Sequence, residues 1–372
     1  MYVHAPFCAR RCLYCDFAVT VRKTGDLEGW VRALAGELVY VQREGLFALS
    51  DHLRTLYVGG GTPSLLGPQA MQGLARVIGP DRLSDPELEW TAEANPESFT
   101  ADVAEGWRAA GVNRISLGAQ SFDAGALRWM GRLHGADGPP AAVEIARDVG
   151  IDNVSVDLIF GLPSHLGRSW EDDLHRAVDL DVPHISLYGL TVEAGTALGR
   201  AVKERRETPV DDDQYREEFL VAAEVLIAAG YRHYEVSNFA RPGFESRHNA
   251  TYWLGQPYLG LGNGAHSFAP PVRRWNLRAW EEYSLAARSS RNPEAEREVL
   301  DTAAVALERI WLGLRTDQGL VRPPEGTAVA GLVDDWIERG LARQMQDRVC
   351  LTTQGWLLLD RLAVDYDAVG PG

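Results

Sequence analysis

The sequence predicts an α/β fold built on a parallel sheet, because short apolar runs alternate with longer stretches of helical period. Strands are expected at 56–58, 88–94, 112–119, 154–160 and 184–190, and helices at 26–46, 67–79, 101–110, 139–149 and 169–180. Each helix of such an alternation returns the chain to the same edge of the sheet, so the strands run parallel. Periodicity does not separate an open doubly wound sheet from a closed or partial barrel, since both bury their strands on two faces.

The chain beyond this alternation is expected to form smaller parts. The segment 211–229 begins with three aspartates and stops at Gly230, which predicts a long amphipathic helix. The polar run RSSRNPEAERE at 288–298 contains a proline and is predicted to be a linker. We therefore expect three parts, at 1–210, 211–290 and 295–372.

The last part combines a helical rhythm from Val299 to Leu314 with the run LARQMQDRVCLTTQGWLLLDRLA. That run predicts two short strands and a helix, as in a winged helix, with Cys350 as a small apolar core residue. Winged helices often bind DNA, but the 52 acidic residues of the chain outnumber its 37 basic ones and give a net charge of -15. An acidic chain repels phosphate backbones, so we expect a packing role and no nucleic-acid partner.

Composition also bears on location. With 372 residues and 45% hydrophobic content, the chain can bury a large core. No apolar run reaches the length of a membrane span, and the N-terminus has no pattern of a removable signal. The expected location is therefore the reducing cytoplasm, without a transmembrane segment.

Cys8, Cys12 and Cys15 lie in HAPFCARRCLYCDF, with the spacing C-x3-C-x2-C. A cuboidal 4Fe-4S cluster ordinarily takes four cysteines, so three thiolates in one loop would leave one iron open for chemistry. A disulfide framework is not expected in a long chain with four cysteines. Structural zinc would need a fourth ligand, and His4 and Asp16 stand at no familiar zinc spacing. The spacing therefore favours the cluster.

Polar side chains stand where three of the predicted strands end. Glu93 closes one run, Gln120 and Ser121 follow another, and Asp157 lies in VSVDLIF. Since the carboxyl ends of parallel strands share an edge, we expect one ligand site there rather than coincident caps. The run GGGTPS at 59–64 has neither phosphate-loop nor dinucleotide spacing, so alone it predicts only a tight turn that a ligand can approach closely.

The run YVHAPFC-x3-C-x2-CDF resembles the cluster loop of the radical S-adenosylmethionine (SAM) enzymes. It is similar above all to the branch that contains oxygen-independent coproporphyrinogen oxidases and HemW-type haem chaperones. The resemblance continues through ISLYGLTVEAGT, YEVSNFARPG, RHNATYW and YLGLGNGAHSF and covers nearly the whole chain. It implies a partial (β/α)6 barrel with a smaller C-terminal α+β, winged-helix-like domain. It also implies that the amino and carboxylate groups of SAM chelate the open iron, and that an electron from the cluster cleaves the sulfonium.

The same resemblance implies site residues. For SAM they are Tyr2, Gly60, Gly61, Thr62, Glu93, Gln120, Arg132, Asp157, Tyr188 and Leu190. The planar fork of an arginine suits the SAM carboxylate, although Arg132 taken alone would be read as part of a solvated helix face. For haem they are His248, Asn249, Tyr252 and Trp253, the H-N-x-x-Y-W element. Imidazole can ligate iron and aromatic rings can cover the macrocycle, but a lone histidine beside aromatics is more often structural. His266 in GNGAHSF is the rival ligand.

Two departures separate the chain from the decarboxylating oxidases. Phe17 stands where they carry a further cysteine, and their long N-terminal extension is not in this sequence. We therefore expect a haem chaperone that carries a 4Fe-4S cluster and exchangeable SAM, needs an electron donor, and transfers haem to an acceptor protein, in transient contact with a membrane where the acceptor lies there. The alternative is an oxygen-independent coproporphyrinogen III oxidase. The sequence leaves open whether SAM has a gating role or serves a reaction.

Overall fold

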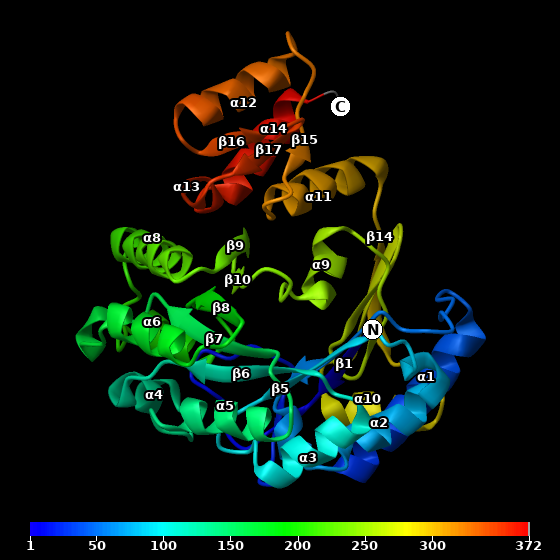
Figure 1. Cartoon of the computed structure of the whole chain (residues 1–372). Coiled ribbons are helices and arrows are strands. Elements are labelled where there is room, and N and C mark those ends of the chain that lie inside the picture. Colours follow the sequence, from blue (N-terminus) through cyan, green and yellow to red (C-terminus); the bar gives the residue numbers. More distant parts are fainter. Residues whose placement is uncertain (371–372) are drawn as a thin grey trace.

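The computed structural model describes residues 1–370 and is built on a nine-stranded sheet in the order β11-β1-β4-β5-β6-β7-β8-β10-β9 (Figure 1). Neighbours from β11 to β8 pair in parallel, whereas β10 and β9 continue the sheet antiparallel. The strands of this sheet are β1 (Tyr2–Ala5), β4 (Thr55–Gly60), β5 (Glu89–Ala94), β6 (Arg114–Gln120), β7 (Val154–Phe160), β8 (His184–Gly189), β9 (Arg232–Glu235), β10 (Asn238–Ala240) and β11 (Gly260–Leu261). The predicted α/β class is therefore confirmed.

Helices connect the parallel strands, and in Figure 1 the helices α1 to α5 lie along one side of the sheet. They are α1 (Leu27–Glu44), α2 (Ala70–Ile78), α3 (Ala101–Ala110), α4 (Ala124–Met130), α5 (Gly138–Asp148), α6 (Trp170–Asp179), α7 (Ala197–Lys203) and α8 (Asp212–Ala228). All the strands and helices expected within 26–190 are present, and α8 begins after the cap residue Asp211, whose carboxylate accepts a hydrogen bond from Gln214 N. Gly230 follows with a φ of 87°, as a helix stop requires.

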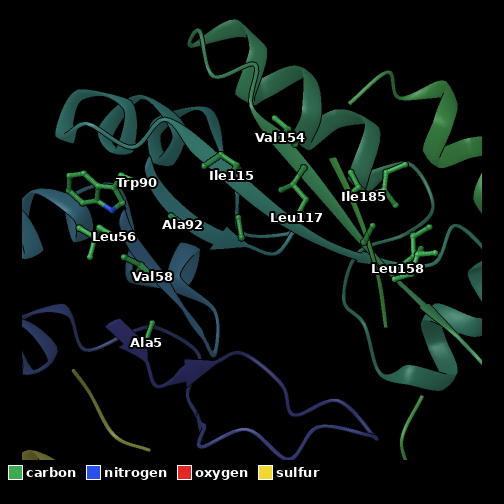
Figure 2. Close-up of a cluster of buried hydrophobic side chains, with 14 of the residues drawn as sticks. Ala5, Leu56, Val58, Trp90, Ala92, Ile115, Leu117, Val154, Leu158 and Ile185 are labelled. Atoms are coloured by element: carbon green, nitrogen blue, oxygen red, sulfur yellow. The ribbon is translucent and has the colours of Figure 1, made fainter. Parts of the chain in front are cut away.

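The main core lies between the parallel strands and these helices. Leu56 and Val58 of β4 alternate with residues of the other face, as do Ile115 and Leu117 of β6, and all four are fully buried. Figure 2 shows these side chains among their neighbours on adjacent strands. Burial of apolar surface contributes roughly 25 cal/mol per Å². This packing holds the parallel strands together, so that their carboxyl ends lie at one edge of the sheet.

A second sheet stands beside β11 and contains β12 (His266–Ala269), β13 (Val272–Asn276) and β14 (Glu294–Val299). In the chain, α9 (Arg247–Trp253) comes before β11, and α10 (Trp280–Arg288) connects β13 to β14. The prediction of a linker over 288–298 was wrong, because β14 pairs with β13 along this stretch. The strand is mostly exposed and most of its charges are paired, with Arg297 donating to Glu294 and Glu44, so it lacks the apolar pattern of a buried strand.

The C-terminal elements lie at the end of the molecule opposite α1 to α5 (Figure 1). They are α11 (Thr302–Leu314), β15 (Leu320–Val321), α12 (Ala328–Glu338), β16 (Ala342–Met345), β17 (Arg348–Leu351), α13 (Thr353–Trp356) and α14 (Leu359–Val369). The two short strands and following helix agree with the winged-helix-like prediction, and Cys350 is 1% exposed. We propose that this unit begins near 300, because a boundary at 295 would divide β14. The remaining short strands are β2 (Phe7–Cys8) and β3 (Thr20–Val21), and each helix within 1–370 is too short or too polar to cross a membrane.

Glu37 joins four segments behind the sheet. It lies on α1 and is 1% exposed, and its carboxylate accepts hydrogen bonds from Gly262 N at 2.8 Å, Tyr283 Oη at 2.6 Å and Asn276 Nδ2 at 2.5 Å. Burial raises the pKa of Glu37 to about 7. This one side chain therefore holds the loop after β11, strand β13 and helix α10 against α1.

We expect Glu37→Ala to lower the free energy of unfolding by about 3 kcal/mol, because it removes the acceptor of three hydrogen bonds and leaves Gly262 N and Tyr283 Oη without a partner. The matched control is Glu28→Ala on the same helix, where an exposed pair with Arg32 is worth less than about 1 kcal/mol. Urea unfolding followed by circular dichroism measures both. Equal losses in the two variants would contradict the structural role of Glu37.

Candidate functional site

A cavity of about 520 Å³ lies at the carboxyl ends of the parallel strands, with the cysteine loop as one wall. It is lined by all three loop cysteines and by nine of the ten predicted SAM residues: Cys8, Cys12, Cys15, Gly60, Gly61, Thr62, Glu93, Gln120, Arg132, Asp157, Tyr188 and Leu190. Tyr2 lines a neighbouring cavity instead. The structure thus brings together residues that are far apart in the sequence.

The glycine run after β4 holds the start of the cysteine loop. Gly61 N donates to Ala5 O at 2.7 Å, and Thr62 N donates to Phe7 O at 2.8 Å. A Cβ added at Gly61 would lie 2.5 Å from Ala5 O, and Gly60 has a φ of 103°. Only glycine permits this close approach without strain. The turn that the sequence predicts therefore positions Cys8, the residue that follows Phe7.

Polar donors reach two of the cysteine sulfurs. Thr62 Oγ1 donates to Cys8 Sγ at 3.4 Å, and Arg132 Nη1 lies 3.7 Å from Cys12 Sγ. Asn95 connects the two donors, because it accepts from Arg132 Nη2 at 2.7 Å and donates to Thr62 Oγ1 at 3.2 Å. Donors to sulfur stabilise thiolate charge and tune a cluster. Sequence reasoning missed Asn95, although its place directly after a predicted strand was the same signal that identified Glu93.

The cysteines fit a cluster better than a single ion. Burial raises the pKa of Cys8 to about 11 and also raises that of Cys15, so these thiols ionise when a metal supplies positive charge. Within residues 1–370, no three His, Cys, Asp or Glu side chains are close enough to share one metal ion. Three half-buried thiols that face one cavity without converging on a point suit a cluster in which each cysteine binds its own iron.

Two half-buried carboxyl groups, those of Glu93 and Asp157, line the cavity. Glu93 accepts hydrogen bonds from Tyr57 Oη at 2.8 Å and Gly60 N at 2.9 Å. Asp157 accepts from Ser116 Oγ at 2.9 Å. Burial raises the pKa of Glu93 to about 7, with a further contribution from Asp157, whose own pKa burial also raises. A cationic ligand would favour the ionised form of both groups.

The remaining predicted SAM residues complete the wall of the cavity. Gln120 ends β6 with a φ of 68°, where the pairing with β7 shifts register. Tyr188 is 45% exposed at the end of β8, and Leu190 N donates to Phe160 O. Arg132 is not on a solvated helix face, since its guanidinium also donates to Gly118 O at 2.7 Å. It is therefore held in place before any ligand binds.

A second cavity, of about 410 Å³, adjoins the first. The residues common to both are Asp16, Phe17, Gly60 and Glu93. Its other lining residues include Tyr2, Tyr252, Tyr258, His266 and Arg278. Phe17 is 63% exposed, so the shared wall reaches the surface. One ligand in each cavity would therefore contact the same wall.

The H-N-x-x-Y-W element does not converge on one cavity. His248 is 1% exposed, with Nδ1 at 2.9 Å from Thr55 Oγ1 and Nε2 at 2.9 Å from Tyr252 Oη. Tyr252 lines the second cavity, whereas Trp253 lines a third, of about 570 Å³, beside α11. Asn249 N is capped by Ser246 Oγ. The prediction that these residues bind haem stays a prediction.

The chain has known relatives in sequence and in fold. The sequence pattern of the Radical SAM superfamily matches residues 2–177, which contain the three cysteines and most of the cavity wall. The chain is 38% identical to the heme chaperone HemW of Mycobacterium tuberculosis, over 97% of this chain and 92% of that protein. It is 32% identical to HemW of Bacillus subtilis, over 96% of each.

The structure of coproporphyrinogen III oxidase (HemN) from Escherichia coli, a radical SAM enzyme, superposes with a TM-score of 0.80 at 22% identity, over 98% of this chain and 89% of that one. That likeness confirms the predicted fold, and the chain belongs to the HemW family of the radical SAM superfamily.

Proposed function

We propose that the protein is a haem chaperone that binds haem in the 410 Å³ cavity, holds a 4Fe-4S cluster and exchangeable SAM in the 520 Å³ cavity, and transfers haem to an acceptor protein. The observation that carries the proposal is the wall that the two cavities share, in a chain whose relatives are named heme chaperones. A cargo in one cavity can then respond to what occupies the other.

The residues of the larger cavity have separate tasks in this proposal. Cys8, Cys12 and Cys15 would hold three irons, while Thr62 and Arg132 donate to their sulfurs. When bound, the cluster and SAM together supply one-electron reduction of the sulfonium. Glu93 and Asp157 would attract the cationic ligand and accept from its polar hydrogens, and Leu190 gives apolar cover.

The smaller cavity suits a flat, largely apolar anion. Tyr252 and Tyr258 meet edge to face, with ring centroids 4.7 Å apart, and present aromatic surface to it. Arg278 is the one arginine of its lining; its exposed guanidinium lies 3.3 Å from the Asp16 carboxylate and would exchange that partner for a carboxylate of the ligand. Haem combines an apolar macrocycle with two propionates. An electron donor and a haem acceptor complete the proposal as partners.

Single alanine replacements of Cys8, Cys12 and Cys15 test the cluster. We expect the reconstituted wild-type protein to hold about four irons per chain and each variant to lose most of them. Cys350→Ala should keep the full content, because that buried thiol lies in the C-terminal unit. Iron and sulfide analysis measures the outcome. Full iron content in a loop variant would remove that cysteine from the ligand set.

The affinity for SAM should depend on pH through Glu93. Its pKa of about 7 means that the carboxylate ionises as pH rises through neutrality, and the ionised form attracts the sulfonium. We expect the Kd of SAM to rise up to about tenfold as pH falls one unit below this pKa. Glu93→Gln should bind SAM weakly and lose most of this dependence. A Kd that follows pH equally in both proteins would assign the titration to another group.

Haem binding and enzyme activity separate the proposal from its alternative. We expect anaerobically reconstituted protein to bind haem one to one, and to form no protoporphyrinogen from coproporphyrinogen, reductant and SAM. Phe17, in place of the further cysteine of the oxidases, supports this expectation. Sustained protoporphyrinogen formation would establish the oxidase instead, and absence of haem binding would end the chaperone proposal.

A further inference from the structure

A histidine that ligates haem iron needs a ring nitrogen whose lone pair is open to the ligand. Both nitrogens of His248 are engaged, by Thr55 and Tyr252, and the ring stacks on Tyr57 with centroids 5.1 Å apart. Breaking these contacts to reach iron would leave the hydroxyl groups of Thr55 and Tyr252 without this partner. The contacts of His248 are therefore those of a structural residue, and neither of its ring nitrogens is open to iron.

Two histidines, His4 and His266, line the second cavity, and the hydrogen bonding of their ring nitrogens differs. His4 places Nδ1 at 2.9 Å from Tyr2 Oη and Nε2 at 3.0 Å from Ala18 O. For His266, the described residues 1–370 provide no hydrogen bond to either ring nitrogen. Its side chain is exposed, at the start of β12. Of His4 and His266, it is His266 whose ring nitrogens are open to a metal centre.

The surroundings of His266 fix its ring and its charge. The ring stacks on Trp275 of the paired strand, with centroids 5.5 Å apart and planes inclined by 24°. Partial desolvation lowers the pKa of His266, and the nearby Arg273 and Arg278 lower it further. A neutral imidazole is the form that ligates iron. Because this stacking already restricts rotation of the His266 ring, haem binding would cost less side-chain entropy.

We propose that His266 is the axial ligand of haem iron and that His248 is a positioning residue that orients Tyr252. This inference rests on the proposed haem-binding function. In this arrangement Tyr252 and Tyr258 contact the macrocycle, and Arg278 pairs with a propionate at the rim. The H-N-x-x-Y-W helix then supplies the wall of the haem site, and the G-N-G-A-H-S-F turn supplies the ligand.

The test is a haem titration of the full-length, anaerobically reconstituted protein, followed through the Soret band. We expect His266→Gly to shift the Soret band of bound haem and to raise the Kd at least about tenfold, the loss of roughly 1.4 kcal/mol. Free imidazole should restore the wild-type spectrum by occupying the space of the missing ring. His175→Ala, an exposed histidine on α6, is the matched control and should leave both unchanged.

His248→Gln separates positioning from ligation. We expect it to weaken haem binding through Tyr252 while the Soret position stays that of the wild type. A shifted spectrum in His248→Gln with an unchanged spectrum in His266→Gly would overturn the assignment and leave the chaperone proposal intact. A wild-type protein that binds no haem would overturn both, and failure of imidazole to rescue His266→Gly would overturn direct ligation.

Discussion

The site depends on one constraint, that β1 and β4 to β8 run parallel and therefore end at one edge of the sheet. Cys8 follows the first of these strands closely in the sequence, and Glu93 lies near the end of β5, whereas Asp157 lies at the middle of β7 and still lines the cavity. Without the parallel register, these groups would be distributed over both edges. The hydrogen-bond chain from Arg132 through Asn95 and Thr62 then joins the loop to this edge.

In the proposed function, the wall shared by the two cavities lets a binding protein use a SAM site. SAM carries a permanent positive charge, whereas haem carries two propionates. Gly60 and Glu93 face both cavities, so a cation in one changes the field in the other. Any such effect is reciprocal, because the factor by which SAM changes haem affinity equals the factor by which haem changes SAM affinity. A gating role therefore needs no further reaction.

Sequence reasoning found the elements whose patterns are local. The strand ends and the glycine turn were predictable, since apolar runs stop at them. The strand β14 was missed because it is exposed and its charges form ion pairs, which removes the apolar alternation of a half-buried strand. Sequence reasoning also did not predict the orientation of the H-N-x-x-Y-W element. His248 and Tyr252 are four residues apart and must lie on the same face of a helix, whereas Trp253 lies on another face. Which face would be buried depends on the strand β4 beneath it, and the motif alone does not contain that.

Phe17 connects the family assignment to the geometry. The residue that departs from the oxidase pattern is a phenylalanine, 63% exposed at the mouth of both cavities. A single exposed apolar side chain needs no explanation in itself. At the rim of a cavity that also presents Tyr252 and Tyr258, however, it extends an aromatic surface on which a macrocycle can lie. A cysteine at this place would bring a reactive thiol to the same rim, so in the proposed function Phe17 favours carrying a porphyrin over transforming one.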